Sequence, residues 1–113
     1  VETQDASIIF VTYGIVSRIC HSAVKKLRNI GIKAGMLRLK TLFPFPKEKI
    51  LSFATKKIPL VVVELSNGQM MEDVILSAKN LTTIIPLLRM GGIVPSVEDV
   101  VDIVKETQVS FHH

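Results

Sequence analysis

Four apolar runs of strand character alternate along this chain with four segments in which apolar residues recur at helical spacing. The strand-like runs span residues 7–14, 33–40, 60–65 and 82–89, and the most apolar of them reads LVVVEL. The helical segments span 16–30, 46–54, 70–79 and 96–104. Alternating strands and helices predict a mainly parallel sheet with helices on both faces. We therefore expect an α/β fold that occupies residues 1–113 as one domain.

Local signals support these boundaries. Gly31 offers a left-handed stop after the first helix, and Ser96 with Asp99 forms a variant capping box for the last. Pro86 has no amide to donate, so its strand is expected to lie at an edge of the sheet or to end at that point. Lys79 is expected in the last turn of the third helix. The residues predicted to be buried on the three best-defined helices are Val16, Ile19, Cys20, Ala23, Val24, Leu27 and Ile30, then Met70, Met71, Val74, Ile75 and Ala78, then Val97, Val100, Val101 and Val104.

Composition narrows the classes of partner. Hydrophobic residues make up 48% of the chain and aromatic residues only 5%, which favours an aliphatic sheet buried on both faces. The net charge of +4 comes from Lys and Arg that are scattered, with doublets at 25–26 and 56–57 and no interleaved aromatic residues. This pattern argues against nucleic acid and favours solvated helix faces, while a weak attraction to an acidic protein partner stays open. No apolar run approaches the roughly 20 residues of a membrane span.

The single cysteine, Cys20, excludes an internal disulfide, a cysteine-ligated cluster or a zinc knuckle within these residues. It also favours a reducing, cytoplasmic compartment. His112 and His113 are either native residues or the start of a purification tag, and they enter no site prediction.

Candidate chemistry should lie where parallel strands end, because ligands of open α/β sheets gather at the carboxyl edge. Glu64 ends the most apolar strand there and precedes a helix start, so it is either a general base or a carboxylate that binds loop amides. We favour the second role, since no second polar group is evident. Gly14 reads as a turn residue, because the further glycines of a dinucleotide motif and the lysine of a phosphate loop are missing. Cys20 and His21 point about 100° apart on a helix and cannot form a catalytic pair.

Several segments together resemble one known module. They are YGIVSRICHSAVKKLRNIGIKAGMLRLKTLFPFP, VVVELSNGQMMEDV and GGIVPSVEDVVDIVKE. Their order and spacing resemble the C-terminal domain of the α subunit of 2-oxoacid:ferredoxin oxidoreductases, within the wider class of transketolase C-terminal-like domains. The PFP and NGQ motifs favour the ferredoxin-linked branch. The resemblance implies a three-layer α/β/α sandwich with a mixed sheet of about five strands, one of them antiparallel. The residue pattern supports about four; the fifth would be the N-terminal residues or residues 92–94.

The resemblance also implies a function for the parent enzyme. That enzyme would convert a 2-oxoacid and coenzyme A to acyl-CoA and carbon dioxide while it reduces ferredoxin. Thiamine diphosphate, Mg²⁺ and iron–sulfur clusters would be held by other domains and by the β subunit. This domain would serve architecture and subunit contacts, with no catalytic, cofactor-binding or metal-binding residue of its own. The expected partners are the rest of the α subunit, the β subunit and ferredoxin.

We place the candidate interface at the carboxyl edge of the sheet, where this domain would meet the rest of the enzyme that the resemblance implies. The residues predicted to form it are Tyr13, Gly14, Phe43, Phe45, Glu64, Asn67, Gly68 and Gln69. The two phenylalanines of FPFP serve equally well as a rigid connector packed beneath a helix. Two alternatives to the whole assignment stay open: the C-terminal domain of another thiamine-dependent enzyme, of the transketolase or dehydrogenase type, and a free-standing α/β binding module.

Overall fold

A computed structural model describes residues 5–14, 16–40, 45–64, 69–88 and 96–111 of the chain. Strands and helices alternate along it: β1 (Ile8–Tyr13), α1 (Val16–Asn29), β2 (Ala34–Leu39), α2 (Lys47–Thr55), β3 (Leu60–Glu64), α3 (Gln69–Ala78), β4 (Ile84–Leu88) and α4 (Val97–Phe111). The described strands form one four-stranded sheet of order β2-β1-β3-β4, in which every pairing is parallel. The predicted α/β fold is confirmed at this level, and residues 92–94, one candidate for a fifth strand, lie outside the described residues.

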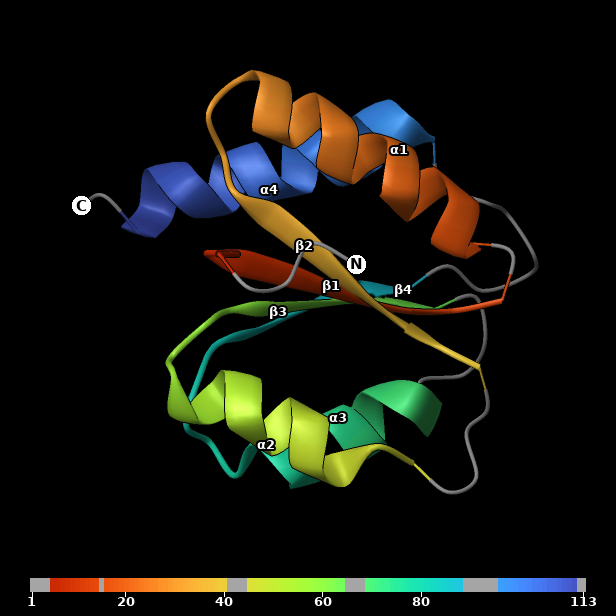
Figure 1. The fold of residues 1–113 in the computed structure, drawn as a ribbon, viewed down its shortest axis with the longest axis vertical. Helices are drawn as coiled ribbons and strands as arrows, with labels where there is room; N and C mark the ends of the chain where they lie inside the picture. The colour runs from red at the N-terminus through yellow and green to blue at the C-terminus, as the bar shows by residue number, and fades with distance from the viewer. Residues whose placement is uncertain (1–4, 15, 41–44, 65–68, 89–95, 112–113) are drawn as a thin grey trace.

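The sheet is covered on both faces. Helices α1 and α4 lie over one face, and α2 and α3 lie over the other (Figure 1). Side chains of a strand alternate between the faces, so Ile8 and Phe10 enter the core under α1 and α4, whereas Ile9 and Val11 enter the core against α2 and α3. All four are completely buried. Burial of each such side chain contributes about 1.5–3 kcal/mol, and this explains why the strand runs are apolar throughout.

The predicted helix ends are confirmed in part. Gly31 follows α1 with a φ of +91°, a left-handed conformation that glycine adopts without strain. The Ser96 amide donates to Asp99 Oδ2 and the Asp99 amide donates to Ser96 Oγ, each at 3.1 Å, so the capping box forms. The prediction for Lys79 is wrong: α3 ends at Ala78, and Lys79 has a φ of +53° outside the helix.

Two residues predicted to be buried are exposed. Ile30 is 55% exposed because α1 ends at Asn29, one residue before it, and the chain then turns at Gly31. Ile75 is 43% exposed, since the buried side of α3 is carried by Met70, Val74 and Ala78. Helical spacing identifies a stripe, but the width of the covered part depends on the neighbouring helix. Pro86 lies on β4, which is an edge strand of the described sheet, and the prediction of an edge position holds at this level.

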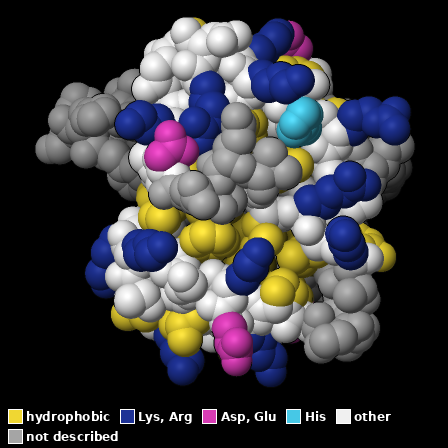
Figure 2. Space-filling view, viewed as in Figure 1, with side chains coloured by type: hydrophobic (Ala, Val, Ile, Leu, Met, Phe, Trp, Pro, Cys, Tyr) yellow, Lys and Arg dark blue, Asp and Glu magenta, His cyan; other side chains and the backbone are white. Residues whose placement is uncertain are grey.

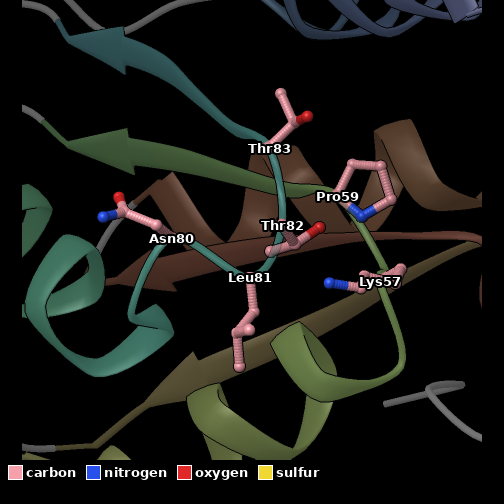
Figure 3. Close-up of a pocket in the computed structure, with 6 residues that line it drawn as sticks. All are labelled: Lys57, Pro59, Asn80, Leu81, Thr82 and Thr83. Carbon is pink, nitrogen blue, oxygen red and sulfur yellow. The ribbon is translucent and has the colours of Figure 1, made fainter.

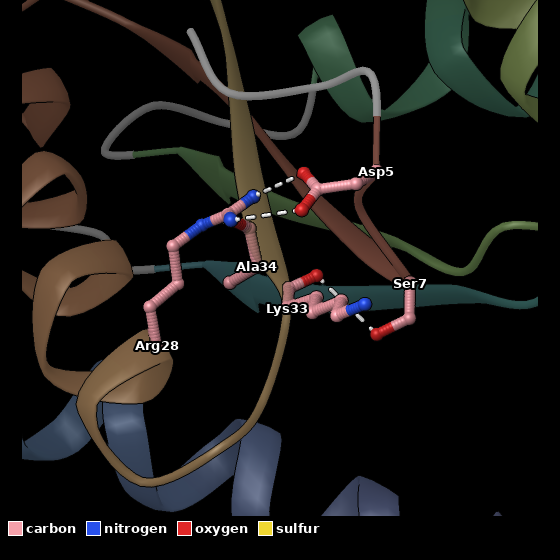
Figure 4. A network of polar contacts seen from close by, with 5 residues as sticks. All are labelled: Asp5, Ser7, Arg28, Lys33 and Ala34. Carbon is pink, nitrogen blue, oxygen red and sulfur yellow. Dashed lines mark hydrogen bonds and ion pairs between the residues drawn. The ribbon is translucent and has the colours of Figure 1, made fainter.

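The amino end of the sheet is closed by a polar network around Arg28 (Figure 4). Its Nη2 donates to Asp5 Oδ1 at 2.9 Å, Nη1 donates to Asp5 Oδ2 at 3.3 Å, and Nε donates to the Ala34 carbonyl at 2.8 Å. The Ser7 amide donates to the Lys33 carbonyl at 2.7 Å. Arg28 therefore ties the last turn of α1 both to the segment before β1 and to the first residue of β2. Among the described residues, no helix is long and apolar enough to cross a membrane.

Candidate functional site at the carboxyl edge of the sheet

The carboxyl ends of the parallel strands meet at one edge of the sheet. Tyr13, the last residue of β1, pairs in register with Leu39 of β2, and Thr12 pairs with Val63 of β3. Glu64 therefore follows Val63 at the level of Tyr13. Because side chains alternate between the two faces of a strand, Glu64 and Tyr13 both lie on the sheet face that α2 and α3 cover. Two of the predicted site residues thus end adjacent strands on the same face.

The carboxylate of Glu64 is bound by the first turn of α3. The Met70 amide donates to Oε2 at 2.9 Å and the Met71 amide donates to Oε1 at 3.0 Å. The residue is only 6% exposed. The amino end of α3, where free amides and the helix dipole favour an anion, is therefore filled by the protein's own carboxylate. This geometry agrees with the structural role that we predicted for Glu64.

A second buried polar contact joins β1 to α1. Thr12 Oγ1 lies 2.9 Å from Ser17 Oγ, and both residues are almost fully buried. Between them the chain turns at Gly14, whose φ of +76° is left-handed and whose carbonyl accepts a hydrogen bond from the Ser17 amide at 3.1 Å. The turn role predicted for Gly14 is confirmed. Sequence reasoning missed the hydroxyl pair, although a threonine inside an apolar strand five residues before a serine was a visible signal.

The other predicted interface residues are distributed around this edge. Tyr13 is 45% exposed, and a side-chain carbon added at Gly14 would meet open space. Phe45 is half-buried and packs against the core formed with α2 and α3, and Gln69 is the first residue of α3. Phe43, Asn67 and Gly68 lie outside the described residues.

Cys20 and His21 do not form a catalytic pair. Cys20 is completely buried in the core under α1 and α4, and burial raises the pKa of its thiol to about 12. A thiol held protonated inside an apolar core is a poor nucleophile and a poor metal ligand. Within the described ranges, no three His, Cys, Asp or Glu side chains are grouped so as to hold a metal ion.

A shallow hollow lies where β3 and β4 begin, away from the carboxyl edge. It has a volume of about 560 Å³, and its lining comes from the connections that follow α2 and α3 (Figure 3). Lys57 and Asn80 there have φ values of 63° and 61°. The lining residues are Lys57, Pro59, Asn80, Leu81, Thr82 and Thr83. Only Lys57 among them carries a charge, so the hollow offers no acid–base pair.

Together these observations define a parallel-sheet α/β domain. At its described carboxyl edge, internal hydrogen bonds join the ends of β1 and β3 to the starts of α1 and α3. The sequence profile named pyruvate:ferredoxin oxidoreductase core domain II matches residues 6–100, and the chain belongs to that family.

Individual relatives agree with this assignment. Ketoisovalerate oxidoreductase subunit VorB of Methanothermobacter marburgensis is 42% identical over 103 residues, which are 91% of this chain and 29% of VorB. The 2-oxoglutarate synthase subunit KorA of Methanothermobacter thermautotrophicus is 33% identical over 102 residues, which are 90% of this chain and 27% of KorA. The chain thus spans less than a third of the length of these relatives.

The fold has a counterpart among solved structures. It matches part of a 2-oxoglutarate:ferredoxin oxidoreductase from Magnetococcus marinus with 2-oxoglutarate, coenzyme A and succinyl-CoA bound. The TM-score is 0.75 at 24% identity, over 89% of this chain and 18% of that one. This likeness supports the fold.

Proposed function

We propose that this chain is a structural and assembly domain of a 2-oxoacid:ferredoxin oxidoreductase. The parent enzyme oxidatively decarboxylates a 2-oxoacid with coenzyme A, yields acyl-CoA and carbon dioxide, and passes the electrons to ferredoxin. The observation that carries this proposal is the family match over residues 6–100. The identity to VorB and KorA, subunits of a ketoisovalerate oxidoreductase and a 2-oxoglutarate synthase, supports it.

We further propose that residues 1–113 form the C-terminal, transketolase-like domain of the α subunit. In this arrangement the sheet of the whole domain has about five strands in a three-layer sandwich, one of them antiparallel. The helices on both faces of the four described strands support this architecture. The partners are the remaining domains of the α subunit, the β subunit and ferredoxin, in the cytoplasm.

The described residues do not fit the cofactors of such an enzyme. Thiamine diphosphate needs a divalent cation and free hydrogen-bond donors for its phosphates. The two backbone amides in the first turn of α3 are not free, because they already donate to the carboxylate of Glu64. Iron–sulfur clusters need thiolates, and Cys20 is buried and protonated. We therefore assign thiamine diphosphate, Mg²⁺ and the clusters to other parts of the enzyme, and no reaction step to this chain.

The contact surface of the domain in our proposal is the carboxyl edge. Tyr13 contributes a half-exposed ring there, and Glu64 holds the first turn of α3, which begins at Gln69, against the end of β3. Gly14, Phe43, Phe45, Asn67 and Gly68 complete the proposed surface. Rigid internal hydrogen bonds suit an interface, because little conformational entropy is lost when such an edge binds a partner.

The test is made in the complete enzyme, assembled with and without the segment that corresponds to residues 6–100. We expect the intact enzyme to reduce ferredoxin in a reaction that requires both a 2-oxoacid and coenzyme A. Without the segment, the subunits should fail to assemble in size-exclusion chromatography. A shortened enzyme that assembles and turns over normally would refute the assembly role, and an intact enzyme without 2-oxoacid oxidation would refute the assigned reaction.

A further inference from the structure

The charges of this chain are segregated along the sequence. Residues 6–47 contain eight Lys and Arg and no Asp or Glu. The other six Lys and Arg and all ten Asp and Glu lie in the rest of the chain. The formal net charge of +4 therefore combines +8 in one segment with −4 in the remainder. The folded segment comprises β1, α1 and β2 and ends at the first residue of α2.

The fold gathers this segment at one side of the molecule. Strand β2 lies at one edge of the described four-stranded sheet, β1 is its neighbour, and α1 contacts both. Arg18 and Lys25 are exposed on α1, and their separation of seven residues puts them on the same side of the helix.

Two further cations lie on β2, on the face of the sheet that α1 covers. Arg38 and Lys40 alternate with Leu37 and Leu39, so they lie on the face of the strand that carries Met36. Met36 packs in the core under α1 and α4. Arg38 and Lys40 therefore project on the α1 side of the sheet, and both are exposed. We name Arg18, Lys25, Arg38 and Lys40 the basic face.

The basic face is not neutralised by the rest of the domain. Lys26 pairs with Glu98 at 3.0 Å and Arg28 pairs with Asp5 at 2.9 Å, but none of the four residues of the basic face has an ion-pair partner within the described ranges. The first turn of α1 also lacks an acidic residue, so its helix dipole adds to the positive potential. Figure 2, which shows the side where β2 passes in front of β1, presents many Lys and Arg side chains and few Asp and Glu.

We propose that the basic face is a docking surface for a carboxylate-rich protein. Unpaired cations repel one another, so a one-sided cluster costs folding stability and is offset when an acidic surface covers it. A nucleic-acid site would add aromatic side chains among the cations, but Tyr13 is the only aromatic residue of the described part of β1, α1 and β2 whose side chain is exposed. Complementary charges raise the rate at which two proteins encounter each other, and salt screens this attraction.

The experiment uses fluorescein-labelled poly-L-glutamate as the acidic surface and fluorescence anisotropy as the readout. The test variant of the 113-residue chain carries Arg18→Gln, Lys25→Gln, Arg38→Gln and Lys40→Gln. The control variant carries Lys49→Gln, Lys56→Gln, Lys57→Gln and Lys79→Gln, four exposed lysines on or beside α2 and α3. Each variant lowers the formal net charge from +4 to 0, so only the position of the lost charges differs. Thermal unfolding of each variant verifies that it is folded.

We expect the wild-type chain to bind poly-L-glutamate at low ionic strength and to lose that binding at about 0.5 M salt. The test variant should bind at least about tenfold more weakly, whereas the control variant should stay within about twofold of the wild type. Equal loss in both variants, or no binding by the wild type, would overturn the proposal. Tighter binding of a duplex DNA of similar charge would assign the face to nucleic acid instead. Salt-sensitive self-association of the chain would assign it to the acidic part of a second copy. None of these outcomes depends on the enzyme reaction proposed above.

Discussion

Glu64 and Met70 are joined by a hydrogen bond of 2.9 Å in which the Met70 amide donates to the buried carboxylate. Together with the Met71 amide, this contact fixes the start of α3 to the end of β3. Glu64→Ala would leave two amides without this acceptor, and we expect it to lower the free energy of unfolding by about 2 kcal/mol. Urea unfolding measures the change. Glu72→Ala, in the same turn but exposed, is the control and should cost less than about 1 kcal/mol.

The strands and their order of alternation with helices could be predicted from the sequence, because each buried parallel strand is a short continuous apolar run. The role of Glu64 was predictable for a related reason: a carboxylate at the end of such a strand has a helix start within reach. Ile30 was predicted wrongly because α1 ends one residue before it, and Ile75 because sequence spacing does not reveal where a neighbouring helix stops covering the stripe.

Features that depend on two distant segments could not be predicted. The network around Arg28 joins the segment before β1 with α1 and β2, and no local pattern connects Asp5 to Arg28. Likewise, the cations of the basic face look scattered in the sequence. They gather only because residues 18 and 25 share a side of α1 and because α1 packs beside β2, at one edge of the described sheet.

The hydroxyl pair of Thr12 and Ser17 should contribute a measurable coupling energy. We expect the double-mutant cycle of Thr12→Val and Ser17→Ala to give about 1 kcal/mol in favour of the pair, because each single change leaves a buried hydroxyl without its partner. Thermal or urea unfolding of the four proteins supplies the values. A coupling energy indistinguishable from zero would mean that each hydroxyl is satisfied elsewhere.

Asp5 should make stability depend on acid pH. The hydrogen bond from Arg28 holds the pKa of the Asp5 carboxyl below its ordinary value of 3.8. The folded state therefore binds this proton less readily than the unfolded state, so the stabilising contribution is present above pH 3.8 and is lost as the pH falls through the folded pKa. Asp5→Asn should lower the melting temperature at neutral pH, and the difference from wild type should shrink below pH 3.8. Because Asp5 is exposed, high salt should also reduce this difference in melting temperature between the variant and the wild type. A difference that is constant with pH would contradict the assignment.

Cys20 should resist thiol reagents in the folded chain. Burial raises the pKa of its thiol from 9.0 to about 12, so at pH 8 the thiolate is about a thousandfold scarcer than in the unfolded chain. We expect a disulfide reagent to react at least that much more slowly with the folded chain than with chain in denaturant. Between pH 9.0 and about 12 the unfolded chain releases the Cys20 proton, whereas the folded chain keeps it. The free energy of unfolding should therefore decline as the pH rises above 9.0. Cys20→Ala should abolish the reaction and weaken the decline.

Substitutions of Phe45 and Phe43 separate a packing role from an assembly role at the carboxyl edge. The half-buried ring of Phe45 contacts the core formed with α2 and α3, so Phe45→Ser should lower the free energy of unfolding of this chain by about 1–2 kcal/mol. Phe43, which lies outside the described residues, is proposed as an interface residue. Phe43→Ser should leave the melting temperature of the chain within about two degrees of wild type, yet weaken assembly of the complete enzyme. Calorimetry of the two chains and size-exclusion chromatography of the enzyme separate the effects. If Phe43→Ser instead lowers the melting temperature as much as Phe45→Ser, both rings belong to the core and FPFP is a rigid connector.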